Sequence, residues 1–194
     1  MNQELWTLLE WGSALLAGAY TFLAAFEKRI GWIFAIVSSL LMMVVYVHRN
    51  YTGQVLLNGY YVAMGFYGWV AWGRDEASIP ITRKPWAFHL IAVASCLLLS
   101  ALLGWVFKRH ALSESPYMDA WVTVFSVLAT WMMARKLLEN WLYWCLVDGV
   151  AITLYVTADP PLVPYALLFS SYVVLSAVGW WKWSRSFRLA HAPL

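Results

Sequence analysis

An acidic residue inside a long apolar run is the strongest chemical signal in this sequence of 194 residues. Asp148 is the only charged residue between positions 140 and 156. Helical spacing puts Trp141, Trp144 and Tyr155 on the same stripe as Asp148. An acid beside two indoles can hold a cationic or polar aromatic solute by charge, hydrogen bonding and ring stacking. The alternative is a structural Asp148 that hydrogen-bonds a neighbouring helix.

Four further residues are candidates for the same site. Asn58 is the amide deepest in the interior of its uncharged run, and a buried amide either bridges helices or meets a solute. Tyr61 shares a helical face with Asn58, Asn140 directly precedes the first tryptophan of the acidic stripe, and Trp131 is a weaker candidate. Other indoles lie near the predicted helix ends, where we expect a membrane-interface belt; they are Trp69, Trp72, Trp180 and Trp183.

The composition excludes most other classes of protein. Hydrophobic residues make up 62% of the chain and charged residues 12%, with a mean hydropathy of +0.63, so a soluble fold is excluded. A net charge of +3 with scattered basic residues argues against nucleic-acid binding. The chain has no nucleotide-binding loop, no zinc-protease or serine-hydrolase motif, and only two cysteines. We therefore expect neither an enzyme nor a cofactor or metal.

The apolar runs predict an all-α membrane protein with seven transmembrane helices. A membrane-spanning helix needs about 20 mostly apolar residues. Four runs carry no Asp, Glu, Lys or Arg, and three shorter or interrupted runs contain an acid inside or at one end. The uncharged runs are 30–47, 50–73, 85–107 and 160–181, and the other three are 6–26, 119–134 and 140–156.

The distribution of basic residues predicts the orientation in the membrane. If seven helices alternate, one side holds 3 of the Lys and Arg residues and the other holds 10. Because Lys and Arg accumulate on the cytoplasmic side, we expect the N-terminus outside and the C-terminus in the cytoplasm.

An internal repeat organises the helices. The pattern G-W-x-x-W-x-R ends at Arg74 and again at Arg185, an offset of 111, and Trp32 matches Trp141 at an offset of 109. Chance recurrence of tryptophan is the competing explanation, and matches in register across three spans disfavour it. The repeat predicts a single domain over 1–194 in a parallel 3+1+3 arrangement. Its parts are helices one to three over about 5–73, a connector over about 86–107, and helices five to seven over about 119–183. Parallel repeats of this kind are typical of transporters.

Three segments together resemble the PnuC family of bacterial vitamin transporters. They are the run from Leu57 to Trp72, the run from Glu139 to Trp144, and the run from Asp148 to Tyr155. The W-x-x-W pair followed by the acid and Leu-Tyr is the most specific part, and the resemblance covers nearly the whole chain. It implies seven helices arranged as in SWEET sugar transporters.

The resemblance also implies a function and a site. It implies facilitated uptake of nicotinamide riboside across the bacterial inner membrane, with a cytoplasmic kinase trapping the imported vitamin by phosphorylation, and it favours a homotrimer. The solute site would include Asn140, Trp141, Trp144 and the polar position on the third helix. At that position we expect Gln in nicotinamide riboside carriers, whereas this chain has Asn58. Thiamine is therefore a competing substrate, and a solute-binding subunit that needs an energising partner is the alternative from another class.

Overall fold

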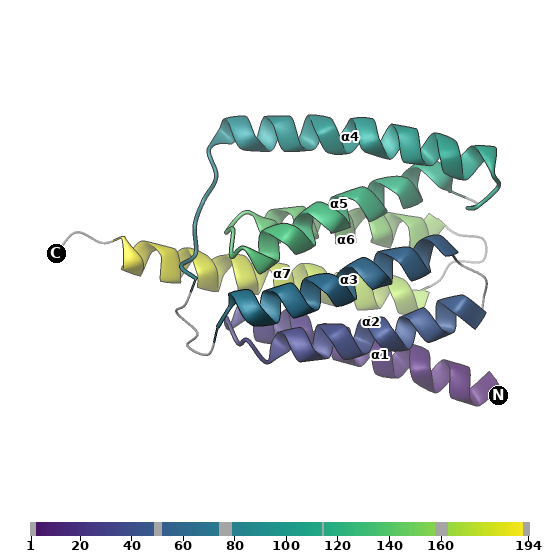
Figure 1. The fold of residues 1–194 in the computed structure, drawn as a ribbon, viewed down its shortest axis with the longest axis horizontal. Coiled ribbons are helices and arrows are strands. Elements are labelled where there is room, and N and C mark those ends of the chain that lie inside the picture. The colour runs from purple at the N-terminus through teal and green to yellow at the C-terminus, as the bar shows by residue number, and fades with distance from the viewer. Residues whose placement is uncertain (1–2, 49–51, 74–78, 114, 158–162, 192–194) are drawn as a thin grey trace. The chain divides into compact units, whose positions relative to one another are not determined.

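Seven α-helices make up most of the computed structural model (Figure 1). The structure describes residues 3–48, 52–73, 79–113, 115–157 and 163–191. The predicted boundaries agree closely with these helices except in the seventh, which continues past Trp181 because basic residues do not end a helix. In the described ranges there is no β-strand, only an isolated bridge between Thr82 and Leu137. The helices are α1 (Gln3–Ala25), α2 (Gly31–His48), α3 (Thr52–Ala71), α4 (Trp86–Arg109), α5 (Pro116–Ala134), α6 (Asn140–Thr157) and α7 (Val163–Ala190).

Three of the described helices, α1, α2 and α4, are long and apolar enough to cross a membrane by length and composition. The other four helices include polar or charged residues. Among them are Asn58 on α3, Asp148 on α6 and Arg185 on α7. Polar residues on spanning helices are placed toward protein rather than lipid.

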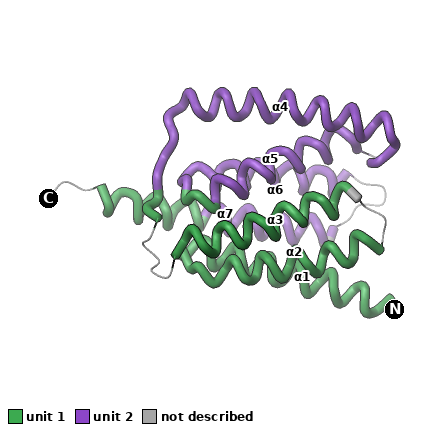
Figure 2. Tube along the Cα trace, in the orientation of Figure 1, with its two compact units in different colours: residues 1–81, 134–136, 178–194 green, residues 82–133, 137–177 purple. Residues whose placement is uncertain are grey.

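The chain divides into two compact units, which Figure 2 colours separately. Unit 1 comprises residues 1–81, 134–136 and 178–194, and unit 2 comprises residues 82–133 and 137–177. Helix α7 therefore belongs to unit 2 up to Ala177 and to unit 1 from Val178 onward. The predicted single domain and its repeat boundaries stay a prediction.

In unit 1, close helix contacts depend on small residues. Helix α2 packs against both α1 and α3. A Cβ on Gly68 would lie 2.2 Å from Cε2 of the buried Trp32 ring, so α3 can approach α2 only with glycine there. Between α1 and α2, Ser13 Oγ donates to the Ser38 carbonyl at 3.1 Å and Ser38 Oγ donates to the Ser13 carbonyl at 2.9 Å.

The turns that end α1 and α5 have the same backbone geometry. Glu27 and Lys136 occupy matching positions of the repeat, 109 residues apart, and both have a positive φ, 58° and 48°. Glycine is usual at this position, so a side chain there carries backbone strain. In each turn the next residue donates its N–H to a carbonyl five positions back, as in a Schellman motif. The bonds are Lys28 N to Leu23 O and Leu137 N to Met132 O, both 2.9 Å.

Those two matching residues form a partly buried ion pair inside unit 1. Lys136 Nζ lies 3.0 Å from Glu27 Oε2, the Lys136 side chain is 0% exposed, and its ammonium lies over the Trp72 ring. Trp72 Nε1 donates to the Ala134 carbonyl at 3.2 Å, and Trp183 Nε1 donates to the Ala24 carbonyl at 3.1 Å.

This arrangement corrects one prediction from the sequence. Trp72 and Trp183 are fully buried, and so they do not belong to an interfacial belt. Each indole instead donates to a carbonyl in the last turn of a helix, where intrahelical hydrogen bonding ends. Aromatic residues near a helix end have both uses, and the sequence does not distinguish them.

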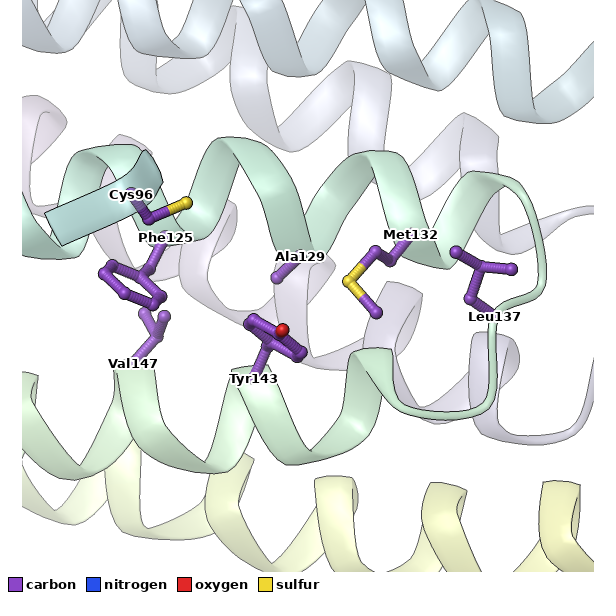
Figure 3. Packing of buried hydrophobic residues seen from close by; sticks show 7 residues of the cluster. All are labelled: Cys96, Phe125, Ala129, Met132, Leu137, Tyr143 and Val147. Atoms are coloured by element: carbon purple, nitrogen blue, oxygen red, sulfur yellow. The ribbon is translucent and has the colours of Figure 1, made fainter. Parts of the chain in front are cut away.

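In unit 2, an apolar cluster joins α4, α5 and α6 (Figure 3). Tyr143 and Val147, four residues apart on α6, face Phe125 and Ala129 of α5, with Cys96 of α4 beside them. The face of α6 that carries Tyr143 and Val147 therefore packs against α5. The other faces of α6 are left for other contacts.

A polar cluster fixes the segment before α4 to the start of α6 within unit 2. Arg83 Nε donates to Glu139 Oε1 at 2.9 Å, and the buried Glu139 carboxylate also accepts the Lys84 backbone N–H. His89 Nδ1 and the Tyr143 hydroxyl are hydrogen-bonded at 3.0 Å. These bonds fix the first turn of α6, where the candidate site begins.

Candidate solute-binding site

The candidate site begins with the first residue of α6. Asn140 is fully buried, and its Nδ2 donates to the Leu137 carbonyl at 2.6 Å. Its amide oxygen is also buried but accepts no hydrogen bond from the described residues. A buried acceptor of this kind needs a partner to offset its desolvation. Asn140 therefore presents an acceptor that the fold itself does not use.

The two tryptophans of α6 have different surroundings. Trp141 is 0% exposed and belongs to the interior. Trp144 is half-buried and packs on the edge of the apolar cluster. Trp144 Nε1 is buried without a hydrogen-bond partner in the described part of the chain. Since Asn140, Trp144 and Asp148 follow one another at intervals of four residues, they share one side of α6.

Asp148 completes this stripe with a buried carboxylate. The residue is 3% exposed, and no described Lys, Arg or His forms an ion pair with it. Tyr172 of α7 is close enough to interact with it electrostatically, as is Cys145 one turn earlier on α6. A buried acid without a basic partner is costly in a membrane helix and is a functional candidate. The structure therefore brings Asn140, Trp144 and Asp148 together as an acceptor, a donor and an acid.

Other predicted site residues of unit 2 have structural neighbours. Tyr155 lies on the same helix, and its ring packs on Tyr165 and Phe169 of α7, both at centroid distances of 5.3 Å. Trp131 of α5 is 37% exposed, and its ring lies 6.4 Å from that of Phe88. These contacts hold α7 to α6 and α4 to α5.

Asn58 and Tyr61 belong to unit 1. Asn58 is buried, and its Nδ2 donates to the Gln54 carbonyl one turn earlier at 2.9 Å. Tyr61 is half-buried beside Tyr60. The Asn58 bond lies within α3 and does not bridge helices. A role of either residue toward a solute stays a prediction.

Tyr172 and Ser176 were missed as site residues by the sequence reasoning. Ser176 is buried on α7 and lies close enough to Cys145 to influence its thiol. Tyr172 lies 111 residues after Tyr61, the offset of the repeated pattern, and this match is the sequence signal that could have identified Tyr172. Among the described residues no group of His, Cys, Asp and Glu could hold a metal ion.

Comparison with known proteins identifies the family of this chain. The family described as nicotinamide mononucleotide transporter matches residues 7–185. The nicotinamide riboside transporter PnuC of Escherichia coli is 22% identical, covering 82% of this chain and 78% of its own. The riboflavin/roseoflavin transporter RibM of Streptomyces davaonensis is 25% identical, covering 97% and 93%.

A solved structure shares the fold. The crystal structure of the vitamin B3 transporter PnuC superposes with a TM-score of 0.76 at 21% sequence identity, covering 94% of this chain and 83% of that one. The all-α fold with seven helices and the resemblance expected from the sequence are both confirmed. Because the family match covers residues 7–185, most of this chain, the chain belongs to the nicotinamide mononucleotide transporter family of membrane proteins.

Proposed function

We propose that this protein carries nicotinamide riboside across the bacterial cytoplasmic membrane by facilitated diffusion. The observation that carries the proposal is the stripe of Asn140, Trp144 and Asp148. The described fold leaves the buried Asn140 amide oxygen and the Trp144 indole N–H without a hydrogen bond, and no described basic residue pairs with the buried Asp148. Relatives named for nicotinamide riboside match four fifths of the chain. These two lines are independent, since one rests on side-chain geometry and the other on sequence.

The chemistry of the solute fits this stripe. Nicotinamide riboside is an aromatic cation that carries an amide and ribose hydroxyls. Its donors can bind Asn140 Oδ1, an acceptor on it can bind Trp144 Nε1, and its positive ring can pair with Asp148. Stacking on an indole adds cation–π attraction. A solute that contacts all three groups forms the hydrogen bonds and the ion pair that the described residues do not form among themselves, and these contacts favour binding.

The direction of transport would come from chemistry after entry. The sequence carries no nucleotide-binding loop, so we propose that a cytoplasmic kinase traps the vitamin as a phosphate. The distribution of Lys and Arg supports an N-terminus outside and a C-terminus in the cytoplasm. Assembly as a homotrimer belongs to the same proposal.

Riboflavin is the second candidate, because RibM matches nearly the whole chain. Riboflavin is a neutral aromatic solute and would not need the charge of Asp148. Thiamine, a cation with an aromatic ring, is the third, because Asn58 is shorter than the Gln we expect in nicotinamide riboside carriers.

Purified protein in liposomes, with labelled nicotinamide riboside, riboflavin and thiamine tested side by side, decides among these solutes. We expect nicotinamide riboside to equilibrate without ATP or another protein, and the other two to enter at the rate of empty liposomes. Binding in calorimetry without flux in liposomes would instead identify a binding subunit that needs an energising partner. Uptake of riboflavin or thiamine alone would reassign the substrate.

A further inference from the structure

A hollow lies where α4 ends and α5 begins, away from the candidate solute site on α6. It is lined by Trp105, Lys108, Arg109 and Tyr117. The two helices approach closely at this point, since a Cβ on Gly104 would lie 2.4 Å from Cδ1 of Tyr117. Glycine thus lets the first turn of α5 lie against the last turns of α4 and places Tyr117 beside the basic residues.

The hollow is positively charged. Lys108 and Arg109 are exposed, and neither forms an ion pair with a described residue. The acid in the first turn of α5, Asp119, accepts a hydrogen bond from the Ser113 hydroxyl. Among the described residues at this end of the two helices, Lys108 and Arg109 thus have no acidic partner, and the Asp119 carboxylate already accepts a hydrogen bond. An anion can therefore pair with the two cations.

An apolar track leads to the hollow along α4. Leu98, Leu102, Trp105 and Arg109 follow one another at helical spacing, and the first three side chains are 63%, 55% and 59% exposed. At a rise of 1.5 Å per residue, the eleven steps from Leu98 to Arg109 span about 16 Å, close to half the roughly 30 Å of bilayer hydrocarbon. An acyl chain beside this track would end with its phosphate level with Arg109.

The aromatic residues fit the same depth. Trp105 and Tyr117 are both about half exposed at the end of an apolar helix, where amphipathic rings lie at the level of lipid headgroups. Long basic side chains also extend toward headgroups from such positions. In the orientation of the proposed function, on which this one point rests, Lys108 and Arg109 are two of the three basic residues on the outer side. The third basic residue of that side is Arg49, so two of the three are adjacent and line the same hollow.

We propose that Lys108 and Arg109 bind the phosphodiester of an anionic phospholipid, whose acyl chain lies along Leu98 and Leu102 and whose headgroup contacts Trp105 and Tyr117. The expected ligand is a phospholipid whose headgroup carries a net negative charge, with its phosphate bound by the two cations. A zwitterionic phospholipid has the same phosphate but no net charge and binds more weakly.

Native mass spectrometry of the detergent-purified protein tests this site without reference to transport. Phosphatidylglycerol and phosphatidylcholine are added in separate titrations. We expect the first to bind at least about tenfold more tightly than the second, because each basic residue near an anionic headgroup contributes about 1 kcal/mol. The double variant K108Q/R109Q should lose this preference, and K108R/R109K, which keeps both charges, should retain it.

The matched control is R185Q/R188Q, which removes two exposed basic residues three positions apart on α7. It should bind phosphatidylglycerol like the unchanged protein. Equal loss in both double variants would show attraction to net charge only and overturn the proposal, as would undiminished binding by K108Q/R109Q. Displacement of the lipid by inorganic phosphate at equal concentration would identify a free-phosphate site and overturn the assignment to a lipid. Failure of vitamin transport would leave these results unaffected.

Discussion

The start of α2 and the start of α6 have the same backbone and different chemistry. Both follow a turn with a side chain at positive φ, and both have a buried tryptophan, Trp32 or Trp141, as the second residue of the helix. Further along, Ala35 stands where α6 has Trp144, and Ser39 stands where α6 has Asp148. The repeat therefore conserves geometry and varies the groups that could meet a solute.

The two regions also differ in how their polar groups are satisfied. On α2, Ser38 exchanges hydrogen bonds with Ser13 of α1, so its hydroxyl serves the packing of two helices. On α6, the amide oxygen of Asn140 and the indole N–H of Trp144 find no partner in the described residues. Buried polar groups that are satisfied give stability, and those left open are available to a ligand. On α2 the Trp32 indole N–H is also buried without a hydrogen-bond partner in the described residues, so the helices differ in degree: α6 leaves open an amide oxygen and an indole N–H close to an acid. This difference is why the proposed solute site is placed on α6.

The largest expected effect comes from breaking the ion pair that joins the two turns. Glu27→Gln removes the Glu27 carboxylate from the fully buried Lys136 ammonium, and removal of one partner of a buried pair costs roughly 3 kcal/mol, less where one partner is partly exposed as Glu27 is. We expect a corresponding loss in the free energy of unfolding, measured by denaturant titration in mixed micelles. Glu4→Gln, on the exposed first turn of α1, is the control and should change little.

The swap E27K/K136E sharpens that test. Because the two positions have the same backbone conformation, the exchanged pair should recover at least half of the stability that Glu27→Gln loses. A swapped protein less stable than the single variant would show that the two turns are equivalent in backbone only.

Trp144→Ala comes next and tests the difference between α6 and α2. Where a nucleic-acid base stacks on an aromatic side chain, removal of that side chain costs about 1 to 3 kcal/mol. By the same contact, the affinity of this protein for an aromatic solute should fall about tenfold to a hundredfold. The unfolding free energy should change less than in a core variant, since Trp144 is half-buried. Calorimetry with nicotinamide riboside measures this, and Leu142→Ala, an exposed position on the same helix, is the control. Unchanged affinity in a well-folded Trp144→Ala protein would contradict a role of α6 in binding.

Asp148→Asn tests charge alone at one position of the stripe. We expect binding of a cationic solute such as nicotinamide riboside to weaken about tenfold, within the range for a charge-assisted contact, and binding of a neutral analogue to stay unchanged. The paired variant Ser39→Ala, at the equivalent position of α2, should affect neither solute. Equal loss for both solutes in Asp148→Asn would make Asp148 structural.

Ser38→Ala should have the smallest effect. Hydrogen bonds between membrane helices contribute about 0.6 kcal/mol on average, so we expect a loss of that order in the unfolding free energy and no change in solute affinity. A change in affinity larger than the change in stability would show that α2 also contributes to binding.

The sequence predicts the helices well because each is an uncharged run bounded by charge or turn residues. It also predicts Asp148 and Trp144, since an acid in an apolar run and its helical neighbours are local features. The ion pair of Glu27 with Lys136 depends on two turns 109 residues apart in sequence. The repeat offset pairs these positions, but only the three-dimensional structure shows that equivalent residues meet. Burial of Trp72 and Trp183 likewise depends on carbonyls of other helices, which no local pattern reports.

The division of α7 between the units has a consequence for biosynthesis. Unit 1 begins with α1 to α3, yet it also needs residues 134–136 and the segment from Val178 onward. Ribosomes add about 5 to 20 residues per second, so roughly 5 to 20 s pass between synthesis of Ile81 and of Val178. The ion pair of Glu27 with Lys136 cannot form until Lys136 is made, and the hydrogen bond from Trp183 to the Ala24 carbonyl forms only after the end of this interval. The first three helices must therefore persist in the membrane as an unfinished assembly, which the second half of α7 completes.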